Sequence, residues 1–515
     1  MERMSPARSG VKWAGLIAGP ALAALAYALL PETFSNTQGQ IIDFTHAGRI
    51  TAALAVWMAT WWMTEAIPVY ATALLPLAVL PLTGAASVKA ASSPYGHELI
   101  FLFMGGFIIA LSMQRWELHR RFAFSVLRLV GSEPRRLVGG FMIATAALSM
   151  WVSNTATTIM MLPIALSVID FLKKNREKAG VAAGQTAGPN TDDRFTVCLL
   201  LGIAYAASIG GIGTLIGTPP NLFLASYVRE NLGVEISFIR WMGVGMPLVV
   251  VFLPLVWLLL TRVIFPIRDM DSAVGRSGVD GVYEKLGPMT RGERATFSVF
   301  LITALTWTFR PLITRIVWAG TRPLAGLTDT GIAVIAALAL FVIPVDIRKR
   351  IFVMDWNTAV RLPWGLLVLF GGGLSLAASI KANGVGEFIA SRVGAIAGFH
   401  PVFLVVVVIT MLVFLTELTS NTATTVTLVP IFASLAEGMR MHPYLLIVPT
   451  AIAASCAFML PVATPPNAIV FGSGLVTVPQ MSKAGLWLNL IGIALITMLT
   501  YAVAMPVLGV EATVF

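Results

Sequence analysis

The sequence predicts an all-α integral membrane protein that is built from two related halves. Of its 515 residues, 57% are hydrophobic and only 12% are charged, whereas soluble domains carry about 25% charged residues. Apolar runs long enough to cross a bilayer recur along the whole chain. Three short motifs occur twice, in the same order. Composition therefore indicates the class of protein, and the repeated motifs indicate its organisation.

The net charge of +10 points to a membrane surface rather than to a nucleic-acid partner. The basic residues gather in short connecting stretches, such as FLKKNREKAG at 171–180 and RRFAFSVLRLVGSEPRR at 120–136. This distribution is typical of cytoplasmic loops beside anionic lipid. We therefore expect a multi-pass protein of the cell inner (plasma) membrane, with the lipid bilayer as a partner and no nucleic acid.

The residue clusters of a membrane-embedded enzyme are missing from the sequence. The two cysteines, Cys198 and Cys456, stand apart in apolar runs, and the five histidines are scattered. There is no HExxH motif, no nucleophile–base pair and no metal-ligand spacing. We therefore expect a protein that is not an enzyme and that has no organic cofactor.

The apolar runs give the order of the spans. Residues 1–30 have a basic start, an apolar run and an Ala-Leu-Ala that resembles a signal-peptide cleavage site. We expect an uncleaved first span, because the first helix of a multispan protein usually supplies its own targeting. Ordinary spans are predicted at 11–30, 50–64 with 66–86, 195–216, 243–266, 296–318, 328–346, 362–381, 443–462 and 484–508. Runs that are too short or broken for ordinary spans lie at 99–114, 137–152, 155–171, 401–418 and 421–437.

The three motifs that recur in register indicate an internal duplication. Repeats in a multispan protein favour a transporter whose binding site lies at the interface of the repeats. The first half is the longer one, largely through a polar loop at 172–194. The matched pairs are LIFLFMGGFIIALS (99–112) with GLLVLFGGGLSLAAS (365–379), SNTATT (153–158) with SNTATT (420–425), and IGTPPN (216–221) with VATPPN (462–467).

Each SNT triplet is predicted to form the tip of a re-entrant helical hairpin. Apolar stretches too short to span flank both copies, and Ser, Asn and Thr are good N-caps for the helix that follows. Irregular backbone at membrane depth is tolerated only when it is buried in protein or lines a wet cavity. The N–H groups and the positive dipole end of the second helix would then point into that cavity, which suits an anion.

Each TPPN motif is predicted to break a helix. Two prolines remove N–H donors and disfavour helical geometry before them. The unwound backbone then exposes carbonyl oxygens that suit a hard monovalent cation. Two tips and two broken helices would give two cation sites around one anion site.

Acidic residues are scarce in these elements, and only Glu417 lies close to a tip. Proton coupling usually requires a titratable group within the membrane, and the obvious candidates are Glu65 and Glu417. We expect Glu417 to be structural, holding a tip or a neighbouring N–H, rather than a proton carrier. Sodium coupling is the better interpretation, since bound cations and helix dipoles would neutralise an anionic substrate. As an alternative, the SNT residues would only join helices by hydrogen bonds and TPPN would be a plain loop.

With these paired SNT and TPPN motifs, the chain resembles the divalent anion/sodium symporter family, the di- and tricarboxylate transporters. The resemblance runs from WWMTEAIP at 61–68 to the final span. It implies about eleven transmembrane helices plus two re-entrant hairpins, inverted repeats, and a homodimer. It also implies separate scaffold and transport domains that work by an elevator-type movement.

The resemblance further implies a site for each ligand. Some relatives carry Ser where Thr218 stands, so substrate preference is open to change. The first sodium ion would be bound by Ser149, Ser153, Asn154 and Gly217, and the second by Thr416, Thr419, Asn421 and Ala463. The substrate would be bound by Asn154, Thr155, Thr218, Pro219, Asn421, Thr422, Thr464 and Pro465.

On this basis the chain divides into four parts. Residues 1–98 would be N-terminal scaffold helices, and 271–354 would be connecting and scaffold helices. The first repeat, 99–270, would contain hairpin 1 (137–171, SNT 153–155) and the break at 218–221. The second, 355–515, would contain hairpin 2 (401–437, SNT 420–422) and the break at 464–467.

The resulting hypothesis is a sodium-coupled transporter of C4 dicarboxylates such as succinate, malate and fumarate. The alternatives are a sodium-independent dicarboxylate exchanger, or a transporter of citrate, 2-oxoglutarate or sulfate. A passive channel is less consistent with two hairpins that close on the membrane midplane.

Overall fold

In the computed structural model the chain is almost entirely helical, and its sheets, within the described residues, are two two-stranded ones. The sequence boundary expected at 270–271 lies outside the described residues. The structure describes residues 6–35, 40–131, 133–178, 191–267, 287–318, 321–392 and 400–510.

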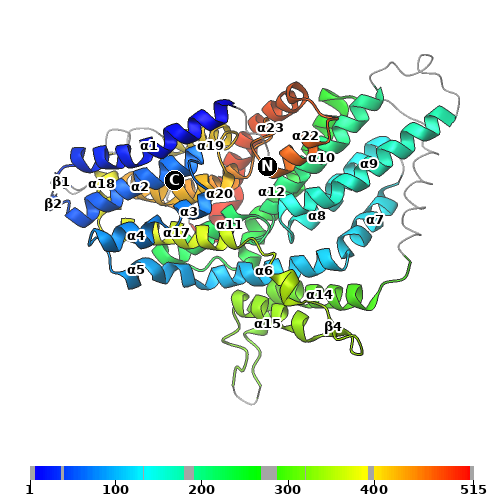
Figure 1. Cartoon of the computed structure of the whole chain (residues 1–515), viewed down its shortest axis with the longest axis horizontal. Helices are drawn as coiled ribbons and strands as arrows, with labels where there is room; N and C mark the ends of the chain where they lie inside the picture. The colour runs from blue at the N-terminus through cyan, green and yellow to red at the C-terminus, as the bar shows by residue number, and fades with distance from the viewer. Residues whose placement is uncertain are drawn as a thin grey trace.

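The first five α-helices occupy one end of the long axis, the sixth runs toward the centre, and the seventh lies toward the other end (Figure 1). Helix α1 packs along α2, because Gly15 and Gly19 have no side chains to hold it away from Thr64 and Trp61. The elements are α1 (Pro6–Leu29), β1 (Thr33–Ser35), β2 (Ile41–Asp43), α2 (His46–Thr64), α3 (Val69–Thr72), α4 (Leu75–Leu82), α5 (Val88–Ser92), the 3₁₀ turn η1 (Ser93–Gly96), α6 (Glu98–Arg115) and α7 (Leu118–Val130).

The elements that carry the first SNT and TPPN motifs occupy the other end and the centre (Figure 1). They are α8 (Pro134–Ser149), α9 (Asn154–Lys178), α10 (Thr191–Ile212), α11 (Pro219–Tyr227), the π-helical turn η2 (Val228–Leu232), α12 (Phe238–Leu258) and the π-helical turn η3 (Leu259–Ile264).

A connecting group follows, of which α14, α15 and β4 project at the bottom of Figure 1. Helix α15 packs against α6, which connects this group to the rest of the protein. The group comprises α14 (Arg291–Ile313), α15 (Asp329–Val342), β3 (Pro344–Asp346), β4 (Ile351–Phe352), α16 (Trp356–Ala359), α17 (Trp364–Ala382) and α18 (Val385–Arg392).

The C-terminal elements repeat the plan of α8–α12. They are α19 (Pro401–Leu415), α20 (Asn421–Gly438), α21 (Tyr444–Ala454), α22 (Pro465–Gly472), α23 (Val478–Leu499), the π-helical turn η4 (Thr500–Ala504) and α24 (Met505–Leu508).

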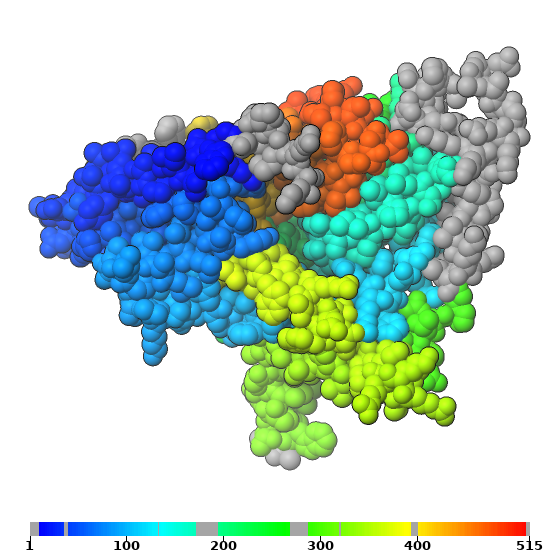
Figure 2. Space-filling model, viewed as in Figure 1, coloured from blue at the N-terminus to red at the C-terminus, as the bar shows by residue number. Residues whose placement is uncertain are grey.

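The two halves interlock rather than standing side by side. Helix α22 of the second half packs on α9 and α10 of the first, and α11 of the first packs on α20 and α21 of the second. Figure 2 shows the orange surface around α22 directly against the teal surface around α8 and α9. Each broken helix therefore supports the tip helix of the other half.

Seven helical segments of the described chain are long and apolar enough to cross a membrane. They include Val88–Arg115, which corrects the prediction that 99–114 is too short, because helical turns continue the run toward the N-terminus. The span predicted at 443–462 is also wrong, since α21 ends at Ala454, where the backbone unwinds ahead of the TPPN motif.

Two adjacent glycines of α6 test the packing against α15. A Cβ at Gly105 would lie 2.7 Å from the backbone oxygen of Ala333, whereas one at Gly106 would first meet a side-chain carbon of Ile216 at 3.5 Å. We expect Gly105→Ala to lower the free energy of unfolding by about 1–3 kcal/mol, because backbone must move. Gly106→Ala is the control and should change it by less than about 0.5 kcal/mol. Unfolding in detergent measures both, and equal losses would contradict the packing.

Candidate functional site

The first tip is the turn between α8 and α9, formed by residues 150–153. The hydroxyl of the fully buried Ser149 lies 2.6 Å from Asn154 Oδ1 and 2.7 Å from the backbone oxygen of Ala207 in α10. A hydroxyl has one proton and donates to only one of these oxygens at a time. Three oxygen atoms therefore meet at this tip. Oxygen is the ligand type that alkali cations prefer.

The second tip repeats this arrangement in the turn between α19 and α20. The buried Thr416 hydroxyl lies 2.9 Å from Asn421 Oδ1 and 2.9 Å from the backbone oxygen of Ala454 in α21. A hydroxyl, an amide oxygen and a helix carbonyl thus meet at both tips. Since the two helix pairs are far apart in the sequence, the duplication extends from the motif to its hydrogen bonds.

Each tip also presents the N-terminus of a helix. At the first tip, Ser153 Oγ accepts a hydrogen bond from the N–H of Ala156 at 3.4 Å, which is a long contact. At the second tip, the side chain of Ser420 makes no capping hydrogen bond with α20, so the expected cap is wrong there. The first turn of α20 therefore has no side-chain cap from Ser420. First-turn N–H groups and the positive end of a helix dipole are suited to an anionic ligand.

The first broken helix is unwound between α10 and α11, as the TPPN pattern predicts. The side-chain amide of the fully buried Asn221 donates to the backbone oxygens of Gly211, at 3.1 Å, and Thr214, at 2.8 Å. These bonds replace part of the helical pairing that the break removes. Asn221 therefore holds the unwound segment in one shape.

Two glycines of this segment allow it to approach the first tip. A Cβ at Gly211 would lie 2.5 Å from Asn154 Oδ1 and 3.1 Å from the backbone oxygen of Gly217. A Cβ at Gly217 would lie 2.4 Å from the backbone oxygen of Gly211. The Asn154 side chain and both glycine carbonyls consequently share one small space, which excludes any larger residue.

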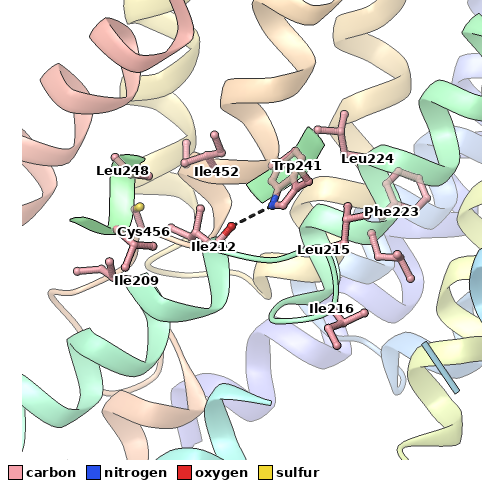
Figure 3. Close-up of a cluster of buried hydrophobic side chains, with 14 of the residues drawn as sticks. Ile209, Ile212, Leu215, Ile216, Phe223, Leu224, Trp241, Leu248, Ile452 and Cys456 are labelled. Carbon is pink, nitrogen blue, oxygen red and sulfur yellow. Dashed lines mark hydrogen bonds between the residues drawn. The ribbon is translucent and has the colours of Figure 1, made fainter. Parts of the chain in front are cut away.

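Apolar side chains support the segment from behind. The indole of Trp241 in α12 donates to the backbone oxygen of Ile212 at 3.0 Å (Figure 3). Figure 3 also places Ile452 and Cys456, from the second half, beside this contact. The unwound carbonyls are thus held by polar bonds among buried hydrophobic side chains.

The second broken helix lies between α21 and α22 and is held in the same manner. The side-chain amide of the fully buried Asn467 donates to the backbone oxygens of Ala457, at 3.2 Å, and Leu460, at 3.0 Å. These acceptors precede Asn467 by ten and seven residues, and the same intervals separate Gly211 and Thr214 from Asn221. The two unwound segments are therefore built to one plan.

The structure brings together most, not all, of the expected sodium ligands. Ser149, Asn154 and Gly217 share the first space, and Thr416 contacts Asn421 at the second. Buried Ala463 lies at the start of α22.

Two of the expected hydroxyls point within their own hairpins. The Ser153 hydroxyl accepts a hydrogen bond from the N–H of Ala156, as described above. The Thr419 hydroxyl contacts the backbone oxygen of Leu415 at 3.0 Å and the hydroxyl of Thr424 at 2.7 Å. Neither contact involves the unwound segments, so these two residues are the weaker part of the expected set.

The expected substrate residues lie at the tips and at the starts of α11 and α22. Buried among them are Thr218, Thr422 and Thr464; partly exposed are Asn154, Thr155, Pro219 and Asn421; and Pro465 is exposed.

Sequence reasoning missed Asn221 and Asn467, which hold the unwound carbonyls. The available signal was the fourth letter of TPPN itself, because an asparagine repeated inside an apolar span needs partners. In the described ranges, no group of three or more His, Cys, Asp or Glu side chains is arranged so that it could hold a metal ion. The oxygen atoms that meet at the two tips, from Ser149, Asn154, Thr416, Asn421 and two helix carbonyls, are all neutral.

Known proteins resemble this chain over most of its length. The family described as "Sodium:sulfate symporter transmembrane region" matches residues 42–510. A sodium-dependent dicarboxylate transporter, SdcS, of Staphylococcus saprophyticus is 42% identical over 504 residues, covering 97% of this chain and 92% of the relative. SdcS of Staphylococcus aureus is 41% identical over 498 residues, covering 96% and 92%. The expectation of a transporter rather than an enzyme agrees with these names.

Solved structures share the fold at low sequence identity. The YdaH transporter of Alcanivorax borkumensis gives a TM-score of 0.58 at 15% identity, covering 96% of this chain and 98% of that one. MtrF of Neisseria gonorrhoeae gives 0.57 at 13% identity, covering 98% and 97%. These likenesses confirm a mostly helical fold that this chain shares with both proteins.

The two buried asparagines predict a matched loss of stability. We expect Asn221→Leu and Asn467→Leu each to lower the free energy of unfolding by about 1–3 kcal/mol, because buried carbonyls lose their donor. The control is Asn231→Leu. Among the described residues, the Asn231 side-chain amide donates only to the backbone oxygen of Tyr227, and Asn231 is partly exposed. This substitution should lower the free energy of unfolding by less than about 0.5 kcal/mol. Denaturant unfolding in detergent measures all three. A control as damaging as the buried pair would refute this role.

Proposed function

Because the chain belongs to the sodium:sulfate symporter family, we propose that it is a sodium-coupled secondary active transporter of C4 dicarboxylates such as succinate, malate and fumarate. The two most informative relatives are named as sodium-dependent dicarboxylate transporters and are 42% and 41% identical to this chain. We place the protein in the cell inner (plasma) membrane as a multi-pass protein, consistent with the seven apolar helical segments found in the described part of the chain.

One observation carries the proposal: the same three-oxygen arrangement occurs at both tips. Ser149 with Asn154, and Thr416 with Asn421, each meet a helix carbonyl within 2.9 Å of the hydroxyl. Neutral oxygen ligands from side chains and unwound backbone suit a sodium ion. A structural hydrogen-bond network alone would not require glycines that bring further carbonyls to the first tip.

In this proposal each tip and its partner segment bind one sodium ion. The first ion is bound by Ser149, Asn154 and the carbonyl region of Gly217, with Ser153 at its edge. The second is bound by Thr416, Asn421 and the backbone near Ala463, with Thr419 at its edge. The weak capping of α9 and α20 leaves their N-termini free to attract the substrate carboxylates.

The substrate would lie between the tips, where the two sodium ions offset its two negative charges. The packing of α22 on α9 and of α11 on α20 supports a shared site, because it directs the start of each broken helix toward the opposite half. The contacts would come from Asn154, Thr155, Thr218, Pro219, Asn421, Thr422, Thr464 and Pro465.

The finer architecture follows from the same plan. We propose two re-entrant hairpins, 137–171 and 401–437, in inverted repeats 99–270 and 355–515, with about eleven transmembrane helices in all. Residues 1–98 and 271–354 would form the scaffold of a homodimer. The transport domain would carry its ligands across by an elevator-type movement against that scaffold.

The second candidate function is transport of another anion. The family description names sulfate, and both helix N-termini suit an oxyanion as well as a carboxylate. Citrate, 2-oxoglutarate and sulfate are therefore the competitors to compare with succinate. Exchange of dicarboxylates without sodium is the other alternative, and the paired cation ligands favour symport over it.

Uptake by purified, reconstituted protein tests the proposed function. We expect labelled succinate to accumulate in proteoliposomes only with an inward sodium gradient, and unlabelled succinate to compete better than sulfate or citrate. Asn154→Ala should reduce uptake at least about tenfold, because it removes an oxygen from a cation site and a substrate contact.

The matched control is Asn231→Ala, which lies outside the proposed site and should transport normally. Uptake that is equal with sodium and with potassium would indicate an exchanger. Sodium-driven uptake at the normal rate by Asn154→Ala would overturn the assignment of the tip.

A further inference from the structure

The two halves differ by one buried charge. Met150 follows Ser149 at the first tip, and Glu417 follows Thr416 at the matching position of the second. The Glu417 side chain is buried, with 3% exposure. A carboxylate is costly to bury unless it is paired or fully hydrogen-bonded. A buried carboxylate is therefore present at the second tip, whereas the matching position of the first tip holds Met150.

Glu417 binds the backbone of the second unwound segment. Its Oε1 accepts from the N–H groups of Phe458, at 2.7 Å, and Met459, at 2.9 Å. Its Oε2 accepts from Met459, at 3.1 Å, and from Leu460, at 3.0 Å. The side-chain amide of Asn489 in α23 donates to Oε1 at 2.8 Å. Glu417 therefore holds neighbouring N–H groups, as we predict from the sequence.

These contacts favour the ionised form of Glu417. Every hydrogen bond that the described residues make to the carboxyl group is donated to it, by three backbone N–H groups and one amide. Hydrogen bonds of this kind stabilise the charged form of a carboxyl group. A protonated acid would instead need an acceptor for its O–H. The hydrogen-bond geometry therefore fits a carboxylate better than a protonated carboxylic acid.

Other side chains hold the carbonyl side of the same segment. Asn467 binds the oxygens of Ala457 and Leu460, as described above. The Tyr205 hydroxyl donates to the oxygen of Phe458 at 2.9 Å, and Ser482 donates to that of Met459 at 3.1 Å. Four consecutive peptide carbonyls are thus fixed by side chains, while Glu417 fixes the N–H groups among them.

The first half satisfies its unwound segment without a charge. The Thr214 hydroxyl binds the backbone oxygen of Met150, and it also accepts from the N–H of Gly217 at 3.1 Å. The indole of Trp241 binds Ile212 at 3.0 Å. All these groups are neutral, so the first cation site lacks the negative potential that Glu417 supplies at the second.

We propose that Glu417 is a positioning residue that makes the second sodium site the tighter of the two. It fixes the unwound segment against the tip, and its charge lies one residue from Thr416, whose hydroxyl joins Asn421 and Ala454. A negative charge near a cation in a low-dielectric interior is worth far more than in water. The second site therefore fills first, and the neutral first site fills at higher sodium concentration. This inference rests on the proposed sodium-coupled function.

The experiment compares Glu417→Gln with Glu417→Asp in proteoliposomes. Gln keeps the length and loses the charge, whereas Asp keeps the charge and loses the length. We expect Glu417→Gln to raise the sodium concentration for half-maximal uptake by about tenfold, with a smaller change in succinate KM at saturating sodium. Glu417→Asp should retain more sodium affinity than Glu417→Gln. The reverse order would overturn the proposal, since shape rather than charge would then decide.

Glu293→Gln is the matched control. Glu293 is also a buried glutamate, and it accepts from Arg121 at 2.9 Å and from the N–H of Thr290 at 2.6 Å, at the start of α14. We expect it to lose stability without a change in sodium dependence. A Glu417→Gln protein that matches this control would overturn the positioning role and leave the transport function standing. Wild-type protein without sodium-driven uptake would instead overturn the proposed function.

A second measurement covers variants that transport too slowly to assay. Purified protein in detergent is heated with increasing sodium chloride, and with choline chloride as the control salt, in the absence of substrate. Sodium binding to the folded state raises Tm by mass action. We expect the sodium midpoint of this rise to shift about tenfold for Glu417→Gln. An unchanged midpoint would overturn the proposal even if uptake is lost.

Discussion

Backbone polar groups that leave a helix inside a membrane protein must find partners within the protein, because lipid offers none. Two segments of this chain leave their helices in this way, at the ends of α10 and α21. Asn221 and Asn467 bind the freed carbonyls from the same sequence intervals. Because these bonds fix the shape of the unwound segments, other backbone oxygens of the segments remain free to face a tip. The proposed cation sites, the proposed substrate site and the interlocked packing all depend on that constraint.

The interlocking makes each tip depend on elements of both halves. Helix α9 starts at the first tip but packs on α22, and α20 starts at the second tip but packs on α11. Each tip is therefore positioned by its own hairpin and by the broken helix of the opposite half. A ligand that binds between the tips contacts elements from both repeats.

Much of this organisation could be predicted from the sequence, because short local motifs determine where helices end and restart. SNT marks the turns between helices, TPPN marks the restarts at Pro219 and Pro465, and the order of elements follows the apolar runs. The side chains that hold the segments were harder to find. Tyr205 and Asn489 reach Phe458 and Glu417 from distant helices. Such contacts depend on three-dimensional packing, which no local pattern reports. The capping role expected for Ser420 failed because an SNT composition fits a cap or a ligand site equally well.

The central claim is that cations bind between the tips and the unwound segments. A density map of the protein in lipid, with sodium and succinate present, tests it most directly. The account predicts one ion beside Asn154 and the glycine carbonyls, and another beside Asn421 and Thr416, with the dicarboxylate between them. The same map in potassium should lack both ions and show weaker density for the tips. Ions bound elsewhere, or tips that lie in lipid and far apart, would contradict the account.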